Sequence, residues 1–200
     1  KNLAGAFYQP NLVLCDTRTF ATLDDSSFAD GTAEIIKHGI LAGGELLKLL
    51  YTPLKAHLET VIQYNVMIKR DIVEADEREH GRRQLLNLGH TIGHAVEHLS
   101  GFQLTHGQAV AIGTCLMTRI CAKQGVCSQA TADEIIKLFT LHGLPTETVY
   151  TAQQVAEVAM LDKKRKSGRI TLVWVEDFGR CVLKDIPVDD YRQLLRLVLP

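Results

Sequence analysis

From about residue 29 to its end, the chain repeats apolar residues at intervals of three and four, and most of these runs stop at a glycine. This spacing places apolar side chains on one face of a helix, and glycine readily ends a helix. Gly101, Gly125 and Gly143 each stand at or just beyond the end of a run. We therefore expect helices over residues 33–41, 45–50, 54–79, 84–99, 107–123, 131–142, 153–161 and 187–199.

Three shorter segments have the composition of β-strands. Residues 169–176 and 180–186 flank a turn sequence at residues 177–179, so they are expected to pair as a hairpin. Residues 11–15 are expected to form a buried strand, and because a lone strand cannot satisfy its own backbone groups, its partners must lie elsewhere. The expected fold is mainly α, with a small β-hairpin and one N-terminal edge strand.

The composition excludes several classes of protein. The 200 residues are 46% hydrophobic and carry a formal net charge of −1, which excludes bulk electrostatic affinity for nucleic acid or an anionic membrane. No run approaches the ~18 apolar residues of a membrane helix. The five cysteines are widely spread and suggest neither a disulfide framework nor a zinc knuckle, so a reducing cytoplasm is the expected location.

Residues 82–97 carry the most distinctive polar pattern. At about 100° per residue, one narrow stripe of a single expected helix holds Arg83, Asn87, His90 and His94. The ordinary interpretation is a solvated face, but such faces are usually built from Lys and Glu. Two histidines four apart can reach one metal or one anion. Gly89 and Gly93 each destabilise a helix by ~1 kcal/mol relative to Ala, so another backbone or a ligand is expected close by.

Two further patterns lie outside this segment. Glu34 and Lys37 share one helical face among apolar residues, which favours partial burial, although a surface ion pair is the alternative. An isolated His106 before a helix is more often a cap or a core residue. With Glu34 and His90, however, it completes one carboxylate and two imidazoles, a set typical of a catalytic zinc with an open position. The charged run at 162–168 is a solvated loop or an anion clamp.

Six motifs, in order and at similar spacing, resemble the C-terminal metal-binding domain of the 3-dehydroquinate synthase family. They are KNL with GAF and QP in residues 1–10, GTAEIIK at 31–37, DE with Gly81 and Arg83, LNLGHTIGH at 86–94, HG with AV in 106–110, and DKK at 162–164. The resemblance covers the whole chain and implies a multi-helical domain of that family.

The resemblance also implies an NAD- and zinc-dependent phosphorus–oxygen lyase. Its enzymes convert a sugar acid phosphate, 3-deoxy-D-arabino-heptulosonate 7-phosphate, to 3-dehydroquinate and phosphate in the shikimate pathway. Zinc, or cobalt in its place, is implied at Glu34, His90 and His106. The positions that resemble substrate contacts are Asn2, Lys37, Lys69, Arg83, Asn87, His94 and one of Lys163 and Lys164. The positions that resemble NAD contacts are Lys1, Thr19, Phe20, Ala21 and Thr22.

In this family the NAD-binding α/β domain lies upstream, and the present sequence has no glycine-rich phosphate loop. We therefore expect residues 1–22 to be the end of the NAD-side segment and residues 23–200 to be the zinc- and substrate-binding domain. Lys1 is expected to be a cut end, and the chain alone is expected to be inactive. The complete protein is expected to be a homodimer, as is usual in the family.

The sequence departs from the family pattern at two places. Residues 24–27 are DDSS where a Pro and an Arg-Glu pair are usual, and Gln108 replaces a Glu expected to support His106. The alternatives are another sugar phosphate cyclase, such as an epi-valiolone or deoxy-scyllo-inosose synthase, a glycerol-type dehydrogenase of the same fold, or a non-catalytic zinc-stabilised helical module. Against the other cyclases stand Arg83, Asn87 and His94, which match the dehydroquinate pattern.

Overall fold

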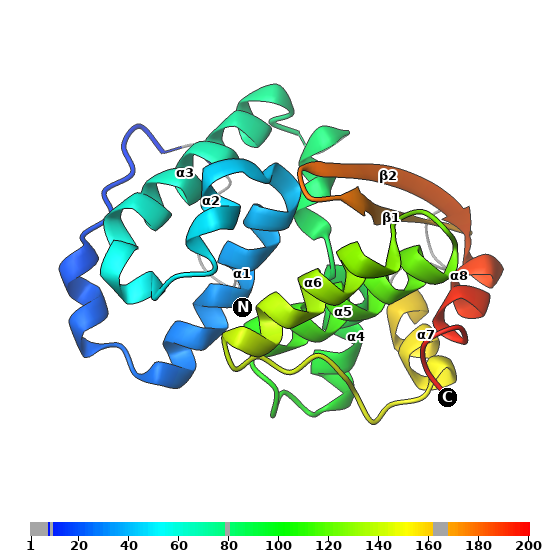
Figure 1. Cartoon of the computed structure of the whole chain (residues 1–200). Coiled ribbons are helices and arrows are strands. Elements are labelled where there is room, and N and C mark those ends of the chain that lie inside the picture. The colour runs from blue at the N-terminus through cyan, green and yellow to red at the C-terminus, as the bar shows by residue number, and fades with distance from the viewer. Residues whose placement is uncertain (1–7, 9, 79–80, 162–167) are drawn as a thin grey trace.

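The computed structural model describes residues 8, 10–78, 81–161 and 168–200, and it is built mainly from helices (Figure 1). The α-helices are α1 (Asp25–Ala42), α2 (Gly44–Leu49), α3 (Leu58–Ala75), α4 (His90–Leu99), α5 (His106–Lys123), α6 (Gln129–Leu141), α7 (Ala152–Leu161) and α8 (Val188–Leu195). Three 3-10 helices are η1 (Thr17–Thr22), η2 (Leu54–His57) and η3 (Arg82–Asn87). Strands β1 (Arg169–Asp177) and β2 (Arg180–Pro187) form one hairpin, so the mainly α fold class is confirmed.

Helix α5 lies at the centre of the helical layer, between α4 and α6 (Figure 1). Residues 109–118 of this helix are all buried, and many of them are small, which lets neighbouring helices approach closely. Helices α1, α4 and α6 all pack against α5. This arrangement brings the middle of α1, the start of α4 and the start of α5 together.

The helix ends follow the chemistry of their capping residues. Asp24 accepts a hydrogen bond from the backbone N–H of Ser27 at the start of α1, and Ser128 accepts one from Thr131 at the start of α6. The DDSS segment that departs from the family pattern therefore forms the N-terminal cap and first turn of α1. The expected helix ends are also observed. Gly101, Gly125 and Gly143 have positive φ angles of 62°, 68° and 70°, a conformation that ends a helix.

The single helix expected over residues 84–99 is wrong. The structure has η3 up to Asn87 and begins α4 at His90, with Gly89 between them in a left-handed conformation at φ 77°. The break lets α4 lie against the backbone of α5. A Cβ atom at Gly93 would stand 2.8 Å from the carbonyl oxygen of Ala109, so the expectation that another backbone comes close to these glycines is confirmed.

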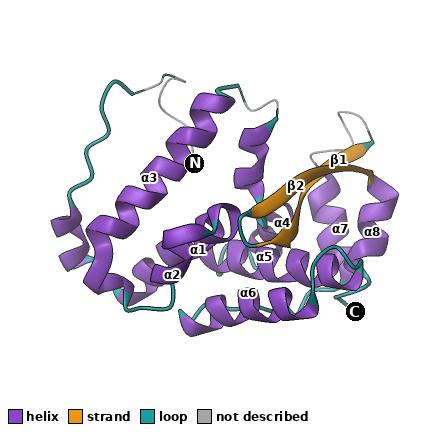
Figure 2. Ribbon diagram, turned by 45° about the horizontal axis from the view of Figure 1, so that its top comes forward, coloured by secondary structure: helices purple, strands orange, loops and turns teal. Residues whose placement is uncertain are grey.

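The buried edge strand expected over residues 11–15 is also wrong. These residues form a loop outside any strand, and Leu14 is 86% exposed. In the described part of the chain the one sheet is the β1–β2 hairpin, which packs against α8 and α5, away from the N-terminal segment (Figure 2). An apolar extended run becomes a buried strand only when a neighbouring strand accepts its backbone hydrogen bonds.

The expected hairpin is confirmed, with β1 and β2 antiparallel from the Arg169–Pro187 pair to the Asp177–Arg180 pair. Its turn is fixed to α1, because the Gly179 N–H donates to the Ile40 carbonyl at 2.8 Å. Across the described residues, we find no helix that combines the length and the apolar character needed to cross a bilayer.

Candidate metal and substrate site

Helix α1 supplies a buried ion pair. Lys37 Nζ lies 2.5 Å from Glu34 Oε2, and the lysine is only 3% exposed. Burial raises the pKa of Glu34, but the Lys37 ammonium and the neighbouring imidazoles outweigh it, so the pKa of this carboxyl lies below its ordinary value. Burial also holds the pKa of Lys37 below its ordinary value, although Glu34 opposes the change.

Helices α4 and α5 bring histidines to the other oxygen of the same carboxylate. Glu34 Oε1 lies 3.5 Å from His90 Nε2 and 3.8 Å from His106 Nε2. His94 joins the group, because its ring centroid lies 5.3 Å from that of His90 and 5.6 Å from that of His106. One ring nitrogen of each histidine lies within 4.8 Å of the others. The structure therefore brings together residues that the sequence separates widely.

The orientation of the two partly buried imidazoles is set by oxygen atoms on their far sides. His90 Nδ1 lies 3.1 Å from the Leu88 carbonyl oxygen, and His106 Nδ1 lies 3.4 Å from Glu97 Oε2. Because carbonyl and carboxylate oxygens only accept hydrogen bonds, each Nδ1 carries a proton, and the other ring nitrogen, Nε2, is the one that faces Glu34. Burial, with the Lys37 charge, lowers the pKa of His90 to about 4, so this ring is neutral at pH 7.

This arrangement suits a cation. Glu34 Oε1 is buried and has no hydrogen-bond donor, although a buried carboxylate oxygen without a partner is costly. The atoms that face it are two imidazole Nε2 nitrogens, a ligand type that binds metal ions together with a carboxylate. The orphaned oxygen and the two Nε2 atoms therefore fit a divalent metal, with His94, which is exposed, at the open side.

Three of the expected substrate contacts lie on other elements. Lys69 is exposed on α3, and its charge helps to lower the pKa of Lys37. Arg83 lies on η3, where its backbone N–H donates to Asp76 Oδ2 at 3.0 Å and its side chain donates to the Glu77 carbonyl at 2.6 Å. Asn87 is the last residue of η3 and is exposed. The expected stripe of four side chains on one helix is therefore divided between η3 and α4.

The expected NAD contacts that are described lie on η1. Asp16 caps this turn, and the Phe20 ring packs edge-on against Phe28 of α1 at 6.3 Å. Thr19, Ala21 and Thr22 are exposed. None of them belongs to the cluster of three histidines on α4 and α5. Lys1, Asn2, Lys163 and Lys164 lie outside the described residues.

Sequence reasoning missed two carboxylates that touch the start of α5. Glu97 follows His90 by two turns of α4 and contacts His106, whereas Gln108 forms a capping box with Thr105. The Gln108 side chain turns back to the Thr105 N–H at 3.1 Å, so the departure at position 108 leaves the His106 contact to Glu97. Asp30, one turn before Glu34, accepts from the Gly107 N–H. Helical spacing from the identified ligands was the available signal for both.

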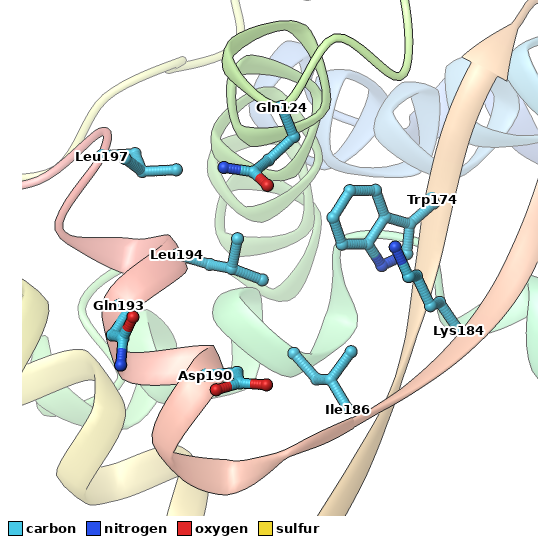
Figure 3. Close-up of a pocket in the computed structure, with 8 residues that line it drawn as sticks. All are labelled: Gln124, Trp174, Lys184, Ile186, Asp190, Gln193, Leu194 and Leu197. Atoms are coloured by element: carbon cyan, nitrogen blue, oxygen red, sulfur yellow. The ribbon is translucent and has the colours of Figure 1, made fainter.

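A separate pocket lies on the opposite part of the molecule, between the hairpin, α8 and the end of α5 (Figure 3). It has a volume of about 340 Å³ and is lined by Gln124, Trp174, Lys184, Ile186, Asp190, Gln193, Leu194 and Leu197. None of the expected site residues in the described chain lines this pocket. The candidate site is therefore the cluster between α1, α4 and α5.

Comparisons with known proteins agree with the motifs. The family described as 3-dehydroquinate synthase C-terminal matches residues 31–165. The 3-dehydroquinate synthase of Pelobacter propionicus is 41% identical over 207 residues, covering 98% of this chain and 56% of the relative. That of Dehalococcoides mccartyi (strain CBDB1) is 38% identical over 193 residues, covering 92% of this chain and 54% of the relative. The chain thus spans little more than half the length of these relatives.

Solved structures of sugar phosphate cyclases share the fold. The 2-epi-5-epi-valiolone synthase from Streptomyces hygroscopicus, solved with NAD+ and Zn2+, has a TM-score of 0.82 at 24% identity, covering 98% of this chain and 57% of that one. A 2-deoxy-scyllo-inosose synthase, solved with carbaglucose-6-phosphate, NAD+ and Co2+, has a TM-score of 0.78 at 19% identity. The match covers 98% of this chain and 58% of that one. Because the family match spans most of the sequence, the chain belongs to the 3-dehydroquinate synthase C-terminal family.

Proposed function

We propose that this chain is the metal- and substrate-binding part of a 3-dehydroquinate synthase. Together with an NAD-binding α/β domain, it would convert 3-deoxy-D-arabino-heptulosonate 7-phosphate to 3-dehydroquinate and phosphate. The observation that carries the proposal is the position of Glu34 Oε1, buried without a donor and facing His90 Nε2 at 3.5 Å and His106 Nε2 at 3.8 Å.

In this proposal Glu34, His90 and His106 hold one zinc or cobalt ion. When bound, the metal supplies a Lewis acid for a substrate hydroxyl, and NAD supplies a reversible hydride acceptor. The chain's own residues keep two of these ligands in the protonation states that bind a metal. Lys37 holds Glu34 ionised, and the low pKa of His90, at about 4, keeps that ring neutral. His94 lies at the exposed side of the cluster, where a substrate hydroxyl can donate to it or accept from it.

The substrate carries a carboxylate and a phosphate, so its site needs several cations and hydrogen-bond donors. Lys37 and Lys69 are close enough for the charge of one to lower the pKa of the other. The proposal assigns anion binding to these lysines with Arg83 and Asn87, and to Asn2 and one of Lys163 and Lys164, which lie outside the described residues. By binding the carboxylate and the phosphate, these side chains would hold the substrate in a fixed position relative to the metal ligands.

The NAD-binding domain is the main partner in this proposal, and the relatives' greater length supports it, because this chain covers 54% to 56% of two of them. Lys1 and residues 19–22 would contact NAD from this side of the cleft. The complete protein is proposed to be a cytoplasmic homodimer. All five cysteines are free, which agrees with a reducing compartment.

The test is phosphate release from the heptulosonate phosphate, with Zn2+ and NAD+ present. The 200-residue chain alone should release none above background, and adding a separately produced N-terminal half should restore turnover. Arg83→Ala should reduce that turnover at least about tenfold. Arg180→Ala is the matched control, because Arg180 is exposed in the hairpin beside Glu176. Turnover that stays at background in the mixture, with both halves folded, would contradict the proposal.

A further inference from the structure

His106 needs more support than the other clustered histidines. It is the first residue of α5, and its side chain is 32% exposed, whereas that of His90 is 15% exposed. A side chain at the start of a helix can move in two ways, by a shift of the helix backbone and by rotation of its ring. Both movements change the distance between His106 Nε2 and Glu34 Oε1, which is 3.8 Å.

The backbone beside His106 is tied to α1 by Asp30. Asp30 Oδ1 accepts hydrogen bonds from the Gly107 N–H at 2.6 Å and from the Gln108 N–H at 3.2 Å. These N–H groups are among those that a helix leaves unsatisfied at its start. A Cβ atom at Gly107 would collide with Asp30, so the glycine permits this close approach. Because Asp30 stands one turn before Glu34, the same helix holds both the ligand carboxylate and the start of α5.

The ring of His106 is oriented by Glu97. Glu97 Oε2 lies 3.4 Å from His106 Nδ1, and the Glu97 side chain is only 20% exposed. The backbone of Glu97 also shapes the loop that leads to His106, because its carbonyl accepts from Ser100 Oγ at 2.7 Å and from the Phe102 N–H at 3.1 Å. Phe102 adopts a positive φ of 62° in this loop, a conformation that non-glycine residues rarely take.

We infer that Glu97 and Asp30 are positioning residues for the metal site, Glu97 fixing the ring of His106 and Asp30 fixing its backbone opposite Glu34. The inference rests on the proposed metal site and assigns neither carboxylate to the metal itself. A carboxylate on the far nitrogen of a metal-binding histidine fixes its tautomer and raises its basicity. The position of Glu97 also explains why position 108 can be a neutral Gln, since the carboxylate that contacts His106 Nδ1 comes from α4.

The test is Zn2+ affinity of the 200-residue chain, measured by competition with a chromophoric chelator. Glu97→Gln keeps the size and an acceptor oxygen but removes the charge, and it should weaken Zn2+ binding about 10- to 100-fold. Asp30→Ala should weaken it as well, whereas Asp30→Asn, which retains an acceptor oxygen, should recover most of the loss. Glu157→Gln is the matched control, because Glu157 is exposed on α7 and accepts a hydrogen bond from Gln153 on the same helix.

A purely structural role for Glu97 would lower the melting temperature of the metal-free chain without changing how metal binds. The visible absorption spectrum of bound Co2+ separates the two, and Glu97→Gln should shift it while Glu157→Gln should not. Wild-type affinity and spectrum in Glu97→Gln would overturn the inference. If the wild-type chain binds neither Zn2+ nor Co2+, the proposed metal site is itself overturned together with this inference, so the wild-type measurement distinguishes the two failures.

Discussion

Lys37 occupies one oxygen of Glu34 and leaves the other open. The ammonium lies 2.5 Å from Oε2, while Oε1 is buried without a donor and faces two imidazoles. The pair is therefore more than a helix-surface ion pair of the usual i, i+3 kind. It keeps a carboxylate ionised inside the protein and directs its unused oxygen to His90 and His106.

Removing the ammonium should destabilise the metal-free chain. Lys37→Met removes the cation from the Glu34 carboxylate, whose side chain is 35% exposed but whose Oε1 is buried, and we expect the free energy of unfolding to fall by about 1–3 kcal/mol. Urea denaturation in EDTA measures the change. Lys48→Met is the matched control, because Lys48 pairs with Glu45 at the same spacing but on the surface, with side chains 72% and 61% exposed.

The control should change stability by less than about 0.5 kcal/mol, because exposed pairs of this kind contribute little. Equal losses in the two variants would contradict the role assigned to Lys37.

The close packing of α4 on α5 predicts opposite effects for two glycine substitutions. Gly93→Ala places a Cβ atom 2.8 Å from the Ala109 carbonyl oxygen, and it should destabilise the chain by about 1–3 kcal/mol. Gly31 is also inside a helix, but nothing lies within 4 Å of its added Cβ. Gly31→Ala should therefore stabilise the chain by up to about 1 kcal/mol. Thermal denaturation checks both signs, and a stabilising Gly93→Ala would show that the helices are not in close contact.

Buried His38 predicts a loss of stability in mild acid. Burial, with the Lys37 charge, holds its pKa below the ordinary 6.5, although Asn65 at 2.7 Å and Glu34 oppose the change and Lys69 adds to it. The unfolded chain therefore takes up a proton below pH 6.5 that the folded chain does not, and folding stability falls as pH falls. The slope from this one group is at most about 1.4 kcal/mol per pH unit.

Urea denaturation in EDTA at pH 7.5 and at pH 5.5 measures this effect. His38→Gln keeps a polar partner for Asn65 but cannot titrate, so its stability should depend less on pH than that of the wild type. The same loss in both proteins would assign the acid sensitivity to other groups.

Much of the helical framework could be predicted from the sequence because its signals are local. Glycines with positive φ end helices at Gly101, Gly125 and Gly143, as their places in the sequence predicted. The glycine pair Gly89 and Gly93 also predicted that another backbone or a ligand lies close, because glycine destabilises a helix and its lack of a Cβ atom allows close approach. These predictions needed no knowledge of the tertiary fold.

The remaining features depend on partners that are distant in the sequence. The sequence pattern places Gly89 inside a continuous helix. The helix is interrupted there because the backbone of α5 lies close to Gly89, which the sequence alone does not show. The apolar run at residues 11–15 has strand composition but no neighbouring strand in the described chain, so it forms an exposed loop. The contact of Glu97 with His106 depends on how α4 packs against the start of α5, which the sequence alone does not show.

The most direct test of the account is the zinc content of the purified chain after equilibrium dialysis, measured by elemental analysis. We expect one Zn2+ per wild-type chain, and almost none in His90→Ala, because Glu34 and His106 alone leave the site with two ligands. His98→Ala is the matched control, since His98 is exposed on the same helix and its ring packs near Phe102 rather than the cluster. It should keep one Zn2+ per chain. Zinc bound equally by the wild type and His90→Ala would contradict the central claim.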